Sequence, residues 1–135
     1  MAKRISTILL VDDDLAINFF HKRLLNKLAF GETIITAHNG ASAISELISL
    51  NGIQKEDDLA IIFLDLNMPV MDGWGFLEHF ENIHHALKFD YKIIILSSSI
   101  NPDDIKRATS NNLVSEYFSK PLTHNNVTNL KEKYL

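Results

Sequence analysis

Three short runs of the chain are almost continuously apolar: Ile5–Val11, Leu59–Leu64 and Tyr91–Leu96. Strands that are buried on both faces of a parallel sheet have this pattern. Two further runs, Thr33–Ala37 and Ser115–Ser119, are of mixed polarity, which suits strands nearer the edge of a sheet. The pattern of apolar and polar positions therefore predicts five strands.

Segments with helical character follow each of these strands. The first three carry apolar residues at the spacing of one helix face. These stripes are Ile17, Phe20, Leu24 and Leu28 within Leu15–Leu28; Ala43, Leu47 and Leu50 within Ala41–Leu50; and Phe76, Phe80, Ile83 and Leu87. Gly73 and Gly75 weaken the helix propensity at the start of the third stripe. Asn101 and Pro102 predict the start of a fourth helix, because Asn caps helices and Pro suits the first helical position. A fifth helix, Thr123–Tyr134, is short and polar.

Strand and helix thus alternate five times along the chain. Connections between parallel strands are right-handed in nearly all proteins, so the helices are expected on both faces of the sheet. We therefore predict a doubly wound α/β domain. The 135 residues match one ordinary domain, and 46% of them are apolar, so we expect residues 1–135 to form a single domain with no output domain.

Charge and composition exclude several classes of partner and site. The net charge is −4 and no block of consecutive Lys or Arg is long enough to follow a phosphate backbone, which argues against sequence-independent nucleic-acid binding. The absence of cysteine excludes disulfides and thiolate metal sites. No apolar run has the length of a membrane helix or the character of a secretory signal. We predict a cytoplasmic protein that binds neither nucleic acid nor membrane.

Polar side chains follow four of the five predicted strands, where each strand ends. They are Asp12, Asp13 and Asp14; Asp65 and Asn67; Ser97, Ser98 and Ser99; and Lys120 with Pro121. Ligands of open parallel sheets bind at this edge. Converging carboxylates repel one another unless a positive charge lies among them. Because all the converging groups are hard oxygens, they favour Mg²⁺, with Mn²⁺ as a second ion of this type, over Zn²⁺.

These groups suit phosphoryl transfer. A carboxylate can act as a nucleophile and form an aspartyl phosphate. The metal and Lys120 would offset the charge that develops on the transferring oxygens, and Ser97 adds a hydroxyl donor. Residue types and spacing therefore predict transfer of a phosphoryl group to an Asp.

Four strings of the sequence resemble one family. They are Ile8-Leu9-Leu10-Val11-Asp12-Asp13, Leu64-Asp65-Leu66-Asn67-Met68-Pro69-Val70-Met71-Asp72-Gly73, Ile94-Ile95-Leu96-Ser97 and Lys120-Pro121. In this order and at these separations they are similar to the receiver domains of two-component response regulators. The resemblance covers essentially the whole chain. It implies the CheY-like, flavodoxin-like fold, with a five-stranded parallel sheet in the order 2-1-3-4-5 and five helices.

The resemblance also implies roles for single residues. Asp65 matches the phosphoacceptor, and Asp12, Asp13 and the backbone carbonyl of Asn67 match its fellow Mg²⁺ ligands. Ser97 matches the hydroxyl that binds the phosphoryl group, together with the family's lysine, Lys120. Tyr117 matches the aromatic switch, and Pro121 the residue that is often joined to that lysine by a cis peptide. The positions of Asn67, Ser98 and Ser99 border the phosphoryl group and modulate access or hydrolysis; Ser97 and Ser98 replace the commoner Thr and Ala.

The implied function is that of a stand-alone regulator. It would take its phosphoryl group from the phosphohistidine of a histidine kinase or phosphotransfer protein, and then switch a protein-binding surface or relay the phosphate. It would catalyse only its own phosphorylation and dephosphorylation. The downstream target is unidentified, and the state would be a monomer or a phosphorylation-dependent dimer.

The remaining polar residues are given structural roles. Asp14 is predicted to cap the first helix, and Asp72 and Gly73 to form a turn and helix start. The six histidines are scattered, no pair of them has a metal-ligand spacing supported by an acid, and they are expected on the surface.

Two alternative functions stay open. A phosphatase of the haloacid dehalogenase type also uses Mg²⁺ and an Asp nucleophile, but it needs a second Asp two residues later, where this chain has Asn67. Steady phosphate release from small phosphoesters would support it. A degenerate receiver that docks constitutively would lack a site residue, and none is missing; failure to bind Mg²⁺ would favour it.

Overall fold

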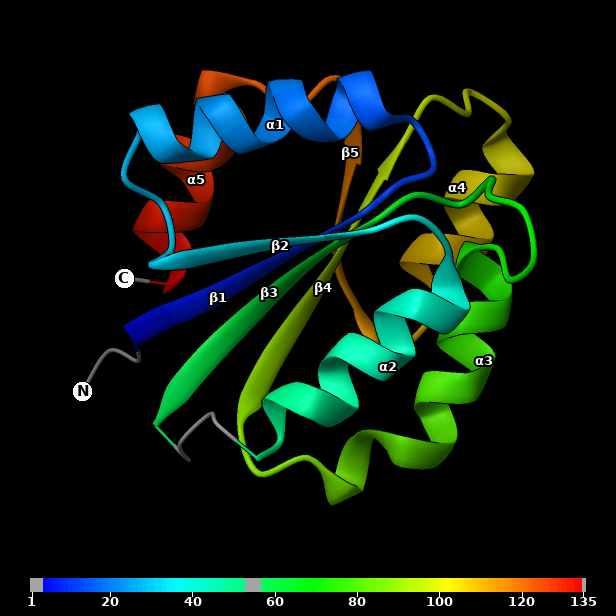
Figure 1. The fold of residues 1–135 in the computed structure, drawn as a ribbon. Helices are drawn as coiled ribbons and strands as arrows, with labels where there is room; N and C mark the ends of the chain where they lie inside the picture. Colours follow the sequence, from blue (N-terminus) through cyan, green and yellow to red (C-terminus); the bar gives the residue numbers. More distant parts are fainter. Residues whose placement is uncertain (1–3, 53–56, 135) are drawn as a thin grey trace.

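A computed structural model describes residues 4–52 and 57–134, which form one sheet with helices on both sides (Figure 1). The strands are β1 (Arg4–Val11), β2 (Thr33–Ala37), β3 (Asp58–Leu64), β4 (Asp90–Ser97) and β5 (Val114–Ser119), and the helices are α1 (Leu15–Lys27), α2 (Gly40–Leu50), α3 (Gly73–Ile83), α4 (Pro102–Thr109) and α5 (His124–Tyr134). All strand pairs are parallel and the order is β2-β1-β3-β4-β5. The predicted fold class and strand order are confirmed. In the described part of the chain, no helix is long and apolar enough to cross a membrane.

The sheet has a hydrophobic core on each face. Helices α1 and α5 cover one face, and α2, α3 and α4 cover the other (Figure 1). Side chains of β1 alternate between the two cores: Ile8 and Leu10 pack with Leu25 of α1, whereas Leu9 and Val11 pack with Leu47 of α2. Strands β1 and β3 are almost fully buried, and β4 is buried from Ile93 to Ser97, because both faces of these strands are covered.

The strand register brings the polar strand ends together. Val11 of β1 lies beside Leu64 of β3, so Asp12 and Asp65, which come next in the chain, lie next to each other. Ser97 pairs with Ser119, so Lys120 follows directly beside Ser97. All these residues lie at the carboxyl edge of the sheet, as the sequence predicts.

The predicted apolar stripe of α1 is confirmed only in part. Leu24 and Leu28 are partly buried and pack against the core, but Phe20 is half exposed, and the residues that α1 buries most deeply are Asn18, His21 and Leu25. Spacing rules choose the most apolar face of a helix, but here two polar side chains lie inward because each has a backbone hydrogen-bond partner in a neighbouring loop. The prediction that the histidines lie on the surface is therefore also wrong for His21.

Helix α3 begins at Gly73, earlier than its apolar stripe indicates, and ends at Ile83. A 3₁₀ turn, His84–Ala86, follows it, so Leu87 lies outside the helix. A side-chain carbon at Gly73 would lie 2.4 Å from the carbonyl oxygen of Asp65. Glycine at this position therefore lets the start of α3 approach the end of β3, which outweighs its low helix propensity.

Three helix starts are capped as predicted. The Asp14 carboxylate accepts hydrogen bonds from the backbone N–H groups of Ala16 and Ile17. The Asp72 carboxylate accepts one from Gly75, and the Asn101 side chain accepts one from Asp103. Such bonds satisfy N–H groups that have no partner within the helix.

Candidate functional site

Three carboxylates meet at the carboxyl edge of the sheet. Ligand oxygens of Asp12, Asp13 and Asp65 all lie within 4.8 Å of one another, with Asp12 and Asp65 buried and Asp13 exposed. The backbone fixes two of them, because Asp12 N–H donates to the carbonyl of Ala37 at 3.0 Å and Asp65 N–H donates to Val11 at 2.9 Å. Both bonds extend the strand pairing by one residue into the site.

Lys120 brings a positive charge between two of these carboxylates. Its Nζ lies 2.5 Å from Oδ2 of Asp12 and 3.2 Å from Oδ1 of Asp65. Its backbone N–H donates to the carbonyl of Ser97 at 2.9 Å, and its peptide bond to Pro121 is cis. The end of β5 thus contributes the cation that faces the ends of β1 and β3.

The electrostatics of the cluster leave it short of positive charge. Burial, followed by the nearby charge of Asp12, raises the pKa of Asp65, although Lys120 and a backbone hydrogen bond with Asn67 oppose the rise. Burial disfavours the charge on Lys120, but the hydrogen bond with Asp12 and the attraction of Asp65 outweigh it, so the pKa of Lys120 is raised. Three carboxylates around one ammonium can accept a divalent cation, and oxygen ligands of this kind fit Mg²⁺.

A chain of hydrogen bonds runs from the site into the loop after β4. Ser97 is buried, and its Oγ accepts a hydrogen bond from Ser99 N–H at 3.0 Å. The Tyr117 hydroxyl donates to the Ser99 carbonyl at 3.1 Å. The Ser99 hydroxyl donates to Oδ2 of Asp104 at 2.8 Å, a contact that the sequence did not indicate. Ser99 therefore connects Ser97 to Tyr117 through its own peptide groups.

The other predicted site residues lie around this cluster. Asn67 and Ser98 are exposed, in the loops after β3 and β4. Pro121 is exposed after Lys120, and Asp14 caps α1 while its N–H donates to the Asp12 carboxylate at 2.9 Å. These positions border the cluster and do not form part of its buried floor.

Comparison with known proteins places this arrangement in a family. The response regulator receiver domain family matches residues 8–131, which include every predicted site residue. The chain belongs to this family. The likeness extends to receiver domains whose structures have been solved.

A two-component response regulator from Cytophaga hutchinsonii is 32% identical to this receiver domain, with a TM-score of 0.85 and coverage of 98% of both chains. The probable methanogenesis regulatory protein FilR2 of Methanothrix harundinacea (strain 6Ac) is 29% identical over 95% of this chain and 83% of its own length. The chemotaxis protein CheY4 of Vibrio cholerae, at 20% identity, shares the fold with a TM-score of 0.69 over 97% of this chain and 99% of its own.

Two residues of the receiver domain support its site and were not predicted. The Asn18 amide donates to the carbonyl of Asp12 at 2.9 Å, and Nε2 of His21 accepts from Leu122 N–H at 3.0 Å. A polar pair three residues apart on one helix face is the signal that could have revealed them, because such residues lie on the same side of a helix.

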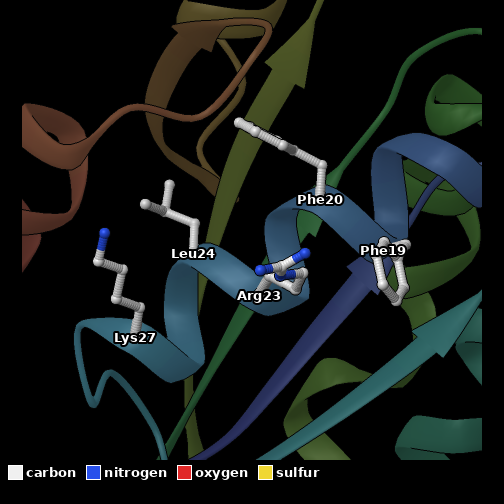
Figure 2. A pocket seen from close by; sticks show the side chains of 5 residues that line it. All are labelled: Phe19, Phe20, Arg23, Leu24 and Lys27. Atoms are coloured by element: carbon white, nitrogen blue, oxygen red, sulfur yellow. The ribbon is translucent and has the colours of Figure 1, made fainter.

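Helix α1 presents a groove along its middle and last turns. It is lined by Phe19, Phe20, Arg23, Leu24 and Lys27 and has a volume of about 520 Å³. Phe20, Leu24 and Lys27 extend to one side of the helix, and Arg23 lies over the ring of Phe19 (Figure 2). Phe19 is 64% exposed. The described part of α1 contains Lys22, Arg23 and Lys27 but no acidic residue, so this surface is apolar and basic.

Proposed function

We propose that this receiver domain accepts a phosphoryl group on Asp65 from a phosphohistidine of a histidine kinase or phosphotransfer protein. The observation that supports it most is the cluster itself, in which a buried Asp65 carboxylate lies 3.2 Å from the Lys120 ammonium and beside two further carboxylates. Burial and the charge of Asp12 raise the pKa of Asp65 in spite of Lys120, so this carboxylate lies in a place that costs free energy, as is common for reactive groups. The family membership of residues 8–131 agrees with this use.

In the proposed reaction, a carboxylate oxygen of Asp65 attacks the phosphorus atom of the donor. The O–P bond forms as the P–N bond of the phosphohistidine breaks, and the imidazole nitrogen keeps the electron pair and takes a proton from water. Lys120 neutralises part of the charge on the phosphoryl oxygens, and the Ser97 hydroxyl donates to one of them. Asp12, Asp13, Asp65 and the Asn67 carbonyl would hold Mg²⁺, which would supply the remaining positive charge.

The switch would work through Ser99. Before phosphorylation, Ser97 Oγ accepts a bond from Ser99 N–H. When Ser97 turns toward the phosphoryl group, that bond is lost and the Ser99 peptide can move. The Tyr117 hydroxyl donates to the Ser99 carbonyl, in the peptide group on the other side of the same residue, so a movement of Ser99 would reach the surface formed by α4, β5 and α5. This surface would then bind a target protein, or the phosphoryl group would pass to a further phosphotransfer protein.

The phosphodonor would dock on the apolar and basic groove of α1. Helix α1 begins at Leu15, two residues after Asp13. A protein that presents a phosphohistidine to Asp65 would contact the start of this helix and could extend along it to the groove. The basic residues Arg23 and Lys27 beside Phe19 and Phe20 favour a donor surface with apolar residues and acidic neighbours. Arg23 and Lys27 would thus set which donors are accepted.

The proposal is tested by incubation with Mg²⁺ and acetyl phosphate, followed by intact-mass measurement. We expect the mass of one added phosphoryl group on the wild type and none on Asp65→Asn. Asp72→Asn is the matched control, because Asp72 caps α3 outside the cluster, and it should be modified like the wild type. Lack of an adduct on the wild type, or an adduct on Asp65→Asn, would refute the proposal.

A further inference from the structure

Helix α1 buries polar side chains where a helix that packs on a sheet usually buries apolar ones. His21 is 1% exposed and Asn18 is 4% exposed, and both face the sheet beside Leu25. Burial of an amide or an imidazole costs free energy unless its polar atoms form hydrogen bonds. The partners of these two side chains therefore indicate what the helix gains by burying them.

Each of the two side chains binds a backbone group of a segment that carries a site residue. Asn18 donates to the carbonyl of Asp12 itself. His21 accepts from the N–H of Leu122, which lies 101 residues away in sequence and only two residues after Lys120. One face of α1 therefore holds both the end of β1 and the turn after β5.

His21 can make this contact only in its neutral form. Nε2 accepts a hydrogen bond, so it carries no proton, and the proton of the ring is on Nδ1. Burial lowers the pKa of His21 to about 4, so the ring is neutral near pH 7. An apolar side chain at position 21 would fill the space but would leave the N–H of Leu122 without its acceptor.

The packing around His21 leaves little room for another arrangement. Asp12, Asn18, His21 and Asp65 border a cavity of only about 10 Å³, together with apolar side chains of the strands. Such a space holds at most about one water molecule. A displacement of the turn at residues 120–122 would therefore need a shift of His21, and a shift of His21 would displace the turn.

We propose that His21 is a positioning residue for phosphoryl transfer: by holding the N–H of Leu122 it fixes the turn that places the Lys120 ammonium between Asp12 and Asp65. This inference rests on the proposed transfer to Asp65. It gives α1 an inward role in the reaction, separate from the docking groove on its outer side.

The first test compares His21→Leu, which has no acceptor, with His21→Gln, whose side-chain oxygen can replace Nε2. Acetyl phosphate is the donor, and the rate constant at saturation is separated from the half-saturating concentration. We expect His21→Leu to lose about 10-fold or more in the saturating rate, because small misplacements of catalytic groups are costly. Its half-saturating concentration should stay close to that of the wild type. His21→Gln should recover most of the rate.

Equal rates in His21→Leu and the wild type would overturn the proposal, and so would equally slow rates in both variants, because a packing role alone does not distinguish Gln from Leu. A second measurement uses only the wild type. Nuclear magnetic resonance should detect a scalar coupling between the nitrogen of Leu122 and Nε2 of His21 across their hydrogen bond; its absence would also overturn the proposal. If the coupling is present but the wild type accepts no phosphoryl group, the proposed function fails, and the role of His21 in transfer fails with it. If the wild type is phosphorylated but the coupling is absent, only the role of His21 is refuted.

Discussion

Acidification should destabilise this protein through His21. The pKa of the buried ring is about 4, against 6.5 for an ordinary histidine, with burial as the main cause. The unfolded chain therefore binds a proton at position 21 in a pH range where the folded protein does not. The stability that the neutral ring allows is fully present above pH 6.5 and is lost as the pH falls toward 4.

The size of the effect follows from the two pKa values. A difference of one in pKa corresponds to about 1.4 kcal/mol, and the two values for His21 differ by roughly 2.5. Between about pH 7 and pH 4 the folded state should therefore lose about 3 kcal/mol of stability from this residue alone. Protonation would also place a second N–H on the ring opposite the N–H of Leu122, so their hydrogen bond could not persist.

Urea unfolding of the wild type and of His21→Gln, followed by Trp74 fluorescence across this pH range, measures the effect. All other ionisable groups are the same in the two proteins, so their contributions cancel in the difference between the two. The free energy of unfolding should fall more steeply with acid in the wild type, by about 3 kcal/mol at pH 4. Parallel curves for the two proteins would show that protonation of His21 does not cause the loss of stability in acid.

Three further predictions concern the site and its surroundings. Gly73→Ala should cost about 1–3 kcal/mol of stability and slow the modification of Asp65, because the new carbon meets backbone atoms of Asp65 and Leu66. Gly75→Ala is the control, because its new carbon meets the flexible Met71 side chain. Equal urea midpoints for the two variants would contradict the prediction for Gly73. Lys120→Met should slow phosphorylation by acetyl phosphate by about 100-fold. Mg²⁺ binding, read from Trp74 fluorescence, should tighten several-fold, because an ammonium no longer competes for the carboxylates. Weaker Mg²⁺ binding would contradict this competition. Phe19→Ser combined with Arg23→Glu should abolish transfer from the histidine kinases of the source organism without changing the reaction with acetyl phosphate, and unchanged kinase profiles would exclude the α1 groove as the docking surface.

The floor of the site was predictable because it depends on buried strands. Runs such as Leu59–Leu64 are apolar enough to be recognised without a structure. In a parallel sheet their ends lie at one edge, which places Asp12, Asp65 and Lys120 together. The helix caps were predictable for a similar reason, since the side chain and the N–H groups it binds are close in sequence.

The supporting contacts could not be predicted, because their partners are distant in sequence or belong to the backbone. Nothing near His21 in the sequence indicates that its acceptor nitrogen faces Leu122, so spacing alone placed Phe20 on the buried face of α1 and left His21 on the surface. Likewise, Gly73 lowers helix propensity locally, and only the approach of α3 to the Asp65 carbonyl explains its place inside the helix. The role of Ser99 as a connector depends on its peptide groups, which every residue carries.

The proposed function depends most on the identity of the phosphoryl acceptor. Borohydride reduces an aspartyl phosphate to homoserine, so treatment after incubation with Mg²⁺ and acetyl phosphate marks the modified residue permanently. Peptide mass spectrometry should then find homoserine at position 65, only in samples that received the phosphodonor. Homoserine at position 12 or 13, or none in a sample whose intact mass shows an added phosphoryl group, would contradict the assignment of Asp65.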